Sequence, residues 1–491
     1  MEQNSSEILR PELWEWVLPA LKAARKSGRE YVDSSRYIPR QDETAYTESD
    51  AGWPQVTSDV MGARPKSEYI DWTEMFGFRN VGVLSRIAVS DVPELAQAMR
   101  EIGQLAMGDQ SLQRGLSLLA PVDGSDEARE QVEFETLKRL IGTILNRADA
   151  TQAETDAELR SIYIEIERAR FSTNLMGDVV VPLLAVSFDL DTPLQIDGDI
   201  WIEPLTQSEH RVRALPWIRD GVVDPYVAAA ATHAIVFKNV EFPNVVHTLR
   251  RGDALPEGIS VDVAHDVAEA VHIVAGASTG HAQVLVRPHG WAADWVLDLP
   301  PLWSCWTGRA YPEELNLREW RSEMSPLSQE DLNTVIRVAR GLKNAPRNVQ
   351  IAARRCRKMT FRDDDEDVVL DLAIGIEALL GREPDALTHR MAQRAAIALS
   401  STIPPESTYK LIKDFYSIRS QIAHGASPKR WTVRLGDREF GAIWIGTLLL
   451  RELLQNLLLS EEPWDAEVLD ERILSAFART ADDAEAPSRD E

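Results

Sequence analysis

Residues 415–425 read FYSIRSQIAHG, and this stretch decides how the C-terminal part of the chain is interpreted. Ile418 and Ile422 are one helical turn apart, with Phe415 a turn earlier, so the segment predicts a helix with one buried face. Gly425 is well suited to follow the last helical residues, because glycine adopts the left-handed conformation at little cost. We therefore expect the helix to end just before this glycine.

Two side chains of this stretch could act on a phosphate. Histidine moves a proton near neutral pH, and arginine keeps its charge and grips phosphate oxygens with a rigid fork. Arg419 and His424 are five positions apart. On a continuous helix that spacing is about 140° of rotation, so the two would not share a face. They converge more easily if the helix ends near His424, or if two copies of the chain combine their pairs. Taken alone, the pair is also what an ordinary helix end with polar caps would show.

Two further helical patterns precede this stretch. Residues 366–381 read EDVVLDLAIGIEALLG and residues 387–399 read LTHRMAQRAAIAL. In this order, and together with residues 409–425, they resemble the Apea-like branch of the HEPN superfamily, and the resemblance covers roughly residues 328–460. The pattern I-x-I-x-P-L-T-x-x-E at residues 200–209 is similar to one often found upstream of such domains.

The resemblance implies an all-α, usually dimeric domain. Many such domains are metal-independent ribonucleases that hold their arginine and histidine at the dimer interface, and others are not catalytic. By this resemblance Arg419 and His424 would be the catalytic residues, and Ser420 matches the polar residue that often follows the arginine. No cofactor and no metal ligand are implied.

Three residues could support that pair. Glu377 lies in the apolar part of its helix, and a buried carboxylate needs a partner, which Arg419 could be. A partly exposed helical glutamate without such a role is the equal alternative. Ser420 and Tyr416 flank the pair in sequence and could donate hydrogen bonds to a phosphate.

Residues 337–362 carry basic side chains and no acidic one. In a chain with a large negative net charge, such a local cluster of positive charge is typical of a surface that binds the phosphate backbone of a nucleic acid. The residues expected to bind RNA are Arg354, Arg355, Arg357 and Lys358. The alternative is a solvated helix face that neutralises the acidic residues at 363–367, and the sequence does not decide between the two.

Composition limits the classes of function. The 491 residues carry a net charge of −25 with a pI near 4.9, which opposes general binding to a polyanion, so any contact with RNA has to be local. Cys305 and Cys356 form neither a disulfide framework nor a zinc set and fit a reducing cytoplasm. The N-terminus does not resemble a signal peptide, and no run of about 18 apolar residues predicts a membrane span. Motifs of P-loop, dinucleotide, zinc-protease and hydrolase sites are absent from the sequence.

The fold class we expect is α+β multidomain, with a mixed α/β N-terminal region followed by an all-α HEPN-like helical bundle. Residues 178–188 are rich in β-formers, and residues 194–202 alternate around Asp197-Gly198, which predicts a hairpin. The expected divisions are an N-terminal helix and long polar loop (1–70), an α-rich region (71–170), an α+β region (171–325), the HEPN-like helical domain (326–478) and a disordered acidic tail (479–491).

These observations lead to one leading hypothesis and its rivals. The leading one is a cytoplasmic, dimeric, metal-independent endoribonuclease, a defence or toxin-like effector that cuts RNA through Arg419 and His424 and leaves 2′,3′-cyclic phosphate and 5′-OH ends. The rival is a non-catalytic HEPN module that dimerises and binds RNA or a nucleotide. A third hypothesis is a pure scaffold in which His424 caps a helix. Catalysis requires His424 to be reachable by solvent in a cleft and within several ångström of an Arg419, whereas a buried ring with internal hydrogen bonds favours the scaffold.

Overall fold

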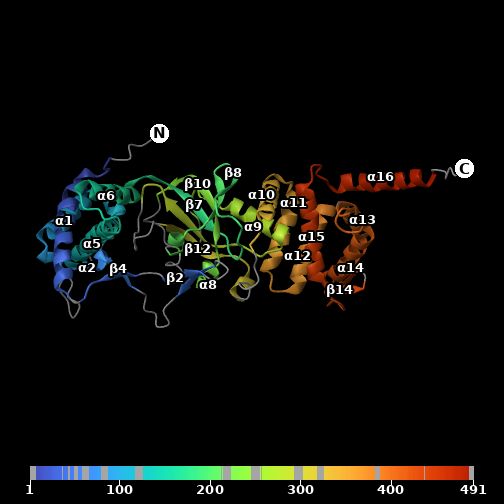
Figure 1. The fold of residues 1–491 in the computed structure, drawn as a ribbon, viewed down its shortest axis with the longest axis horizontal. Coiled ribbons are helices and arrows are strands. Elements are labelled where there is room, and N and C mark those ends of the chain that lie inside the picture. Colours follow the sequence, from blue (N-terminus) through green and yellow to red (C-terminus); the bar gives the residue numbers. More distant parts are fainter. Residues whose placement is uncertain are drawn as a thin grey trace. The chain divides into compact units, whose positions relative to one another are not determined.

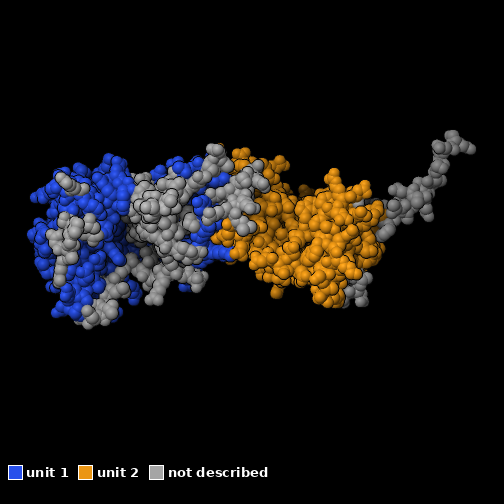
Figure 2. All heavy atoms as spheres, turned by 90° about the horizontal axis from the view of Figure 1, so that it is seen from below, with its two compact units in different colours: residues 1–182, 192–260, 281–309 blue, residues 183–191, 261–280, 310–491 orange. Residues whose placement is uncertain are grey.

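The computed structural model describes residues 7–35, 37–42, 45–48, 53–57, 66–78, 87–116, 125–211, 213, 223–244, 255, 257–291, 302–317, 326–381, 387–435 and 437–485. The chain is mixed α/β and divides into two compact units, which Figure 2 colours separately. The first unit comprises residues 1–182, 192–260 and 281–309, and the second comprises residues 183–191, 261–280 and 310–491.

Helices fill the N-terminal part of the first unit (Figure 1). Those described are α1 (Pro11–Ser34), α2 (Trp72–Met75), α3 (Pro93–Gly108), α4 (Gln110–Gly115), α5 (Asp126–Ala150) and α6 (Asp156–Phe171). Their apolar faces share one core, in which Trp72, Ile144 and Tyr163 are fully buried. Thr155 and Glu158 form a reciprocal capping box at the start of α6, which satisfies two otherwise unpaired N–H groups.

Short strands occupy the stretch where the sequence predicts a long polar loop. β1 (Arg40–Asp42) pairs with β4 (Lys66–Ile70) and β2 (Ala45–Glu48) pairs with β3 (Pro54–Thr57), both antiparallel. Beyond residue 70, in the region predicted to be α-rich, β5 (Phe76–Gly77) pairs in parallel with β6 (Ile87–Ala88), before the 3-10 turn η1 (Val89–Asp91). In the described part of the stretch up to residue 70, the expected irregular loop is therefore wrong. Strand pairing of this kind depends on partners distant in sequence, which local composition does not reveal.

A six-stranded sheet completes the first unit. Its strands are β7 (Asn174–Pro182), β8 (Leu194–Asp197), β9 (Ile200–Pro204), β10 (His233–Pro243), β11 (His281–Pro288) and β12 (Trp303–Ala310), in the spatial order β12-β11-β7-β10-β9-β8. The short helix α8 (Pro225–Ala229) precedes β10. The hairpin predicted at Asp197-Gly198 is confirmed, with Gly198 at a φ of +48° in the turn between β8 and β9. The strand predicted over 178–188 ends at Pro182, beyond which the chain belongs to the second unit.

Helices dominate the second unit. Its described elements are α9 (Asp262–Ala275), η2 (Glu313–Leu317), α10 (Gln329–Asn344), α11 (Arg347–Lys358), η4 (Met359–Phe361), α12 (Asp365–Leu380), α13 (Leu387–Ala398), α14 (Pro405–Ala423), β13 (Thr432–Leu435), β14 (Arg438–Gly441), α15 (Ala442–Leu459) and α16 (Ala466–Glu485). α9 packs against α10 and α11, so it belongs with these helices and not with the sheet, as the division at 171–325 assumed. The helix α16 runs to Glu485, into the tail expected to be disordered from residue 479, and residues 486–491 lie outside the described residues.

The helix α15 lies at the centre of the second unit. Among the described residues, α15 is the one helix whose length and apolar composition would allow it to cross a membrane. It packs against α9, α10, α11, α12 and α14, and its leucines at 449, 450, 453 and 454 are fully buried. This packing explains the apolar composition of α15.

Candidate functional site

The helix α14 places the Arg-His pair at its C-terminal end. The helix stops at Ala423, and His424 is the capping residue outside the last turn. Gly425 has a φ of +75°, in the left-handed region that favours glycine. Its N–H donates to the carbonyl of Ile422 at 2.9 Å, and the N–H of Ala426 reaches back to Gln421 at 2.9 Å. These two bonds close the helix as a Schellman motif. The predicted helix end is therefore confirmed, and His424 lies in the turn and not on a continuous helix.

Arg419 is held by the carboxylate of Glu377. The Nη2 of Arg419 lies 3.1 Å from the Oε1 of Glu377 on α12, and the two side chains are 33% and 24% exposed. The expected ion pair between Glu377 and Arg419 is confirmed. Glu377 is also partly exposed, as the alternative interpretation of this residue predicted. The contact is not aligned as a hydrogen bond, and the Nε of Arg419 has no partner among the described residues. The guanidinium is thus held beside Glu377, with its Nε buried and about a third of the side chain exposed.

His424 and Ser420 are both exposed. Within the described part of the chain, no hydrogen bond or ion pair engages the His424 ring. Its backbone N–H donates to the carbonyl of Ser420 at 3.2 Å, which fixes the main chain of the turn and leaves the ring free. The exposed, unbonded imidazole meets one condition for proton transfer and differs from the buried, bonded ring that the scaffold hypothesis expects.

Tyr416 serves the helical core. The residue is buried, and its hydroxyl donates to the carbonyl of Ala373 on α12 at 3.1 Å. Burial, followed by the nearby charge of Glu377, raises the pKa of Tyr416 well above its ordinary value. The prediction that Tyr416 donates a hydrogen bond to a phosphate is therefore wrong. Its hydroxyl joins α12 to α14, which keeps Glu377 and Arg419 in register.

The basic residues of α11 separate into two groups, of which the first is structural. Arg355 forms an ion pair with Asp371, and the Nε of Arg362 donates to the same carboxylate at 2.8 Å. The Asp371 side chain is almost fully buried, and buried carboxylates need such partners. The expectation that Arg355 binds RNA is therefore corrected, because its charge is used to neutralise a helix-core aspartate.

The second group faces a cavity. Arg354, Arg357 and Lys358 line a pocket of about 940 Å³ between α9 and α11. Arg354 and Lys358 are exposed, and Arg357 is half-buried. Burial lowers the pKa of Arg357, and the nearby Glu269 opposes that effect. These three residues keep cationic groups at a concave surface, and their contact with RNA remains a prediction.

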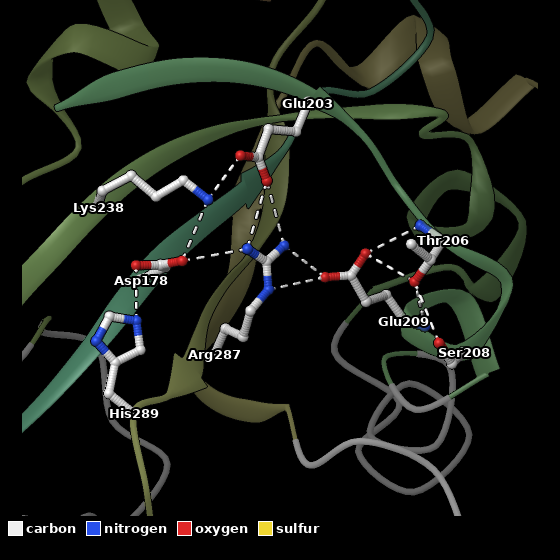
Figure 3. A network of polar contacts seen from close by, with 8 residues as sticks. All are labelled: Asp178, Glu203, Thr206, Ser208, Glu209, Lys238, Arg287 and His289. Carbon is white, nitrogen blue, oxygen red and sulfur yellow. Dashed lines mark hydrogen bonds and ion pairs between the residues drawn. The ribbon is translucent and has the colours of Figure 1, made fainter. Parts of the chain in front are cut away.

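A charged network on the sheet of the first unit contains part of the pattern at residues 200–209 (Figure 3). Glu209 accepts the N–H of Thr206 at 2.9 Å, as in a capping box, and its other oxygen accepts from Arg287 at 2.7 Å. Arg287 also reaches Glu203 at 3.4 Å and Asp178 at 3.2 Å. The threonine and glutamates of this pattern therefore stabilise a helix start and a strand cluster.

Asp178 forms the other half of the network (Figure 3). It contacts Lys238 at 3.2 Å and the Nε2 of His289 at 2.9 Å. Burial would raise the pKa of Asp178, but the N–H of Asn239 and the Lys238 ammonium hold it below the ordinary value. Sequence reasoning missed this network. The signal was weak, because Asp178 and Arg287 become neighbours only through the register of β7 and β11.

Neither a search for metal-binding groups nor comparison with known proteins assigns a function to further residues. Among the described residues, no group of three or more His, Cys, Asp or Glu side chains is placed to hold a metal ion. Comparisons of the chain with protein-family models, with curated proteins and with solved structures give no match. The functional argument therefore rests on the residues of the second unit.

Proposed function

We propose that the chain is a HEPN-type, metal-independent endoribonuclease, a cytoplasmic defence or toxin-like effector. In this proposal a mixed α/β N-terminal region is followed by an all-α HEPN-like bundle over residues 326–478. The observation that carries the proposal is the end of α14, where Glu377 orients Arg419 and the turn that closes the same helix presents an exposed His424.

The chemistry needs no cofactor. The ribose 2′-OH attacks the adjacent phosphorus, so an O2′–P bond forms as the P–O5′ bond breaks. His424 takes the proton of the 2′-OH or returns one to the leaving 5′-oxygen. Arg419 stabilises the charge that builds on the non-bridging oxygens of the phosphorane. The products are a 2′,3′-cyclic phosphate and a 5′-OH end.

A homodimer through the 406–460 helices supplies the second proton-transfer group. One imidazole cannot act as base and acid at the same moment, whereas two copies provide two Arg419/His424 pairs to one cleft. The large aromatic side chain of Trp444 is 52% exposed on α15, within these helices, and supports an interface there.

The test is cleavage of end-labelled RNA in EDTA. Wild-type protein is compared with His424→Ala, Arg419→Ala and the matched control His389→Ala, which removes an exposed histidine of α13 that contacts Tyr409. The proposal expects cleavage by the wild type and the control, with cyclic-phosphate ends, and none by the other two. Equal cleavage by all four proteins would place the activity elsewhere.

A non-catalytic HEPN module that dimerises and binds RNA or a nucleotide is the second candidate. It is favoured by the net charge of −25 and by the use of Arg355 inside the fold, both of which limit the cationic surface with which an endoribonuclease would hold and position its substrate. In the same experiment this module would bind labelled RNA without cutting it, and His424→Ala would change neither result.

A further inference from the structure

The pocket beside α11 has walls of opposite charge. It lies within the second unit, and its lining includes Asp262, Asp266 and Glu269 of α9 and Arg354, Arg357 and Lys358 of α11. Five cationic side chains face three carboxylates, so the pocket is net positive in a chain whose total charge is −25. Its volume of about 940 Å³ is within the range of small-molecule sites.

Helical periodicity builds the two walls. Asp262, Asp266 and Glu269 are spaced four and three residues apart and therefore share one face of α9. Arg354 and Lys358 are four residues apart on α11, with Arg357 beside them. The two helices pack against each other, which turns these faces toward a common space.

The charges at the centre of the pocket are not satisfied by each other. Glu269 makes no ion pair or hydrogen bond with any described residue, and the buried Nε of Arg357 has no acceptor. Burial raises the pKa of Glu269 to about 7 and that of Asp266 above its ordinary value. Burial also lowers the pKa of His265. A ligand that offers both donors and acceptors would satisfy Glu269 and the Nε of Arg357, which the described residues leave unpaired.

An aromatic ring forms part of the wall. Phe361 is 39% exposed although it is a large apolar side chain, and the guanidinium of Arg357 lies 5.4 Å from its ring centroid. An exposed ring next to cationic groups is the combination that stacks a nucleobase while binding its phosphates.

We propose that this pocket binds a nucleoside phosphate, with its phosphates on Arg354 and Lys358 and its base against Phe361. Asp262 and Asp266 accept hydrogen bonds from ribose hydroxyl or base amino groups. Arg362 is excluded from the phosphate set because it is already bonded to Asp371.

This site is separate from the Arg419/His424 pair. The pocket lining includes no residue of α14, which carries the pair, and α11 and α14 each pack against α12. The proposal therefore does not rest on the ribonuclease reaction, and either one can fail without the other.

Calorimetric titration of the full chain tests the proposal. ATP, GTP, CTP and UTP are titrated singly, with adenosine and inorganic triphosphate as partial ligands. At least one nucleoside triphosphate should bind with a Kd below about 1 mM, and more tightly than either partial ligand. Arg354→Ala and Phe361→Ala should each weaken that binding about tenfold. Arg347→Ala, an exposed arginine of α11 outside the pocket lining, should leave the Kd unchanged.

Several outcomes would overturn the proposal. These are no binding by any of the four triphosphates, equal binding of inorganic triphosphate, or an unchanged Kd in both pocket variants. Loss of binding in His424→Ala would place the ligand at the other site and overturn it as well. Circular dichroism shows whether each variant folds. If Phe361→Ala does not fold, Lys358→Ala replaces it, because Lys358 is exposed and its loss should weaken nucleotide binding in the same way.

Discussion

At the scale of single residues, the orientation of Arg419 depends on one carboxylate. Glu377→Gln keeps the shape of the side chain and removes the charge that lies 3.1 Å from the guanidinium. Because the arginine then loses its anchor, we expect kcat for RNA cleavage to fall about tenfold, with a smaller change in KM. Steady-state kinetics measure both values.

The matched control for that variant is Glu439→Gln, which removes an exposed carboxylate 3.4 Å from Arg430. It should leave kcat unchanged. If Glu377→Gln altered only the midpoint of thermal unfolding and left kcat as in the wild type, Glu377 would be a structural residue and not a positioning one.

A second residue-scale prediction concerns Glu269. Burial raises its pKa to about 7, with Asp266 adding to the rise and Arg357 and Arg354 opposing it. A raised carboxyl pKa means that the folded state holds the proton more tightly than the unfolded state. This stabilisation is fully present below the ordinary pKa of 4.5 and is lost as pH rises through 7.

Glu269→Gln lacks that titration. Relative to the variant, the wild type should lose about 1–3 kcal/mol of unfolding free energy between pH 5 and pH 8. Urea denaturation of both proteins at the two pH values measures the difference. A difference that stays constant across this range would show that Glu269 is not desolvated.

At the scale of elements, the second unit depends on close approach of its helices. A Cβ atom on Gly446 of α15 would lie 2.6 Å from a ring carbon of Phe415 on α14 and 3.0 Å from a methyl of Leu372 on α12. Phe415 and Leu372 are fully buried and cannot move aside easily. Gly446→Ala should therefore cost about 1–3 kcal/mol through overpacking.

The same substitution in open space is the control. Gly108 lies in α3 with no atom near the position of an added Cβ, so Gly108→Ala should be neutral or slightly stabilising. Chemical denaturation of both variants separates packing from helix propensity. Equal stability of the two would mean that the three helices are not packed as closely as described.

Elements defined by local chemistry could be predicted from the sequence. Asp197-Gly198 specifies a hairpin and Gly425 a helix end because both depend on backbone conformations that few residues accept. The ion pair of Glu377 with Arg419 could also be predicted, since a carboxylate on an apolar helix face needs a partner.

Features that depend on distant segments could not be predicted. Asp371 is flanked by apolar residues and so needs a partner, but local patterns do not show that Arg355 and Arg362 are the arginines that bind it. α9 is separated from α10 by more than fifty residues, so neither its place in the second unit nor the pocket that it completes is visible in local patterns.

At the scale of the whole molecule, the net charge of −25 confines any RNA contact to local cationic surface, and the proposed reaction depends on a dimer. Trp444 is 52% exposed on α15, which is unusual for a large aromatic residue. We expect the wild type to be a dimer by light scattering, and Trp444→Ser to shift it toward the monomer and lose RNA cleavage.

Met107→Ser is the control for that shift, because Met107 is also 52% exposed but lies on α3 of the first unit. It should leave the molar mass unchanged. Dimers of equal stability in both variants would move the interface away from α15.

In the proposed reaction His424 transfers a proton during RNA cleavage. The single-turnover cleavage rate in EDTA measures this step. The account predicts that His424→Ala lowers this rate by about 10²–10⁴-fold, that His389→Ala does not, and that the wild-type products carry 2′,3′-cyclic phosphates. Equal rates for the wild type and His424→Ala, or no cleavage by the wild-type dimer, would contradict it.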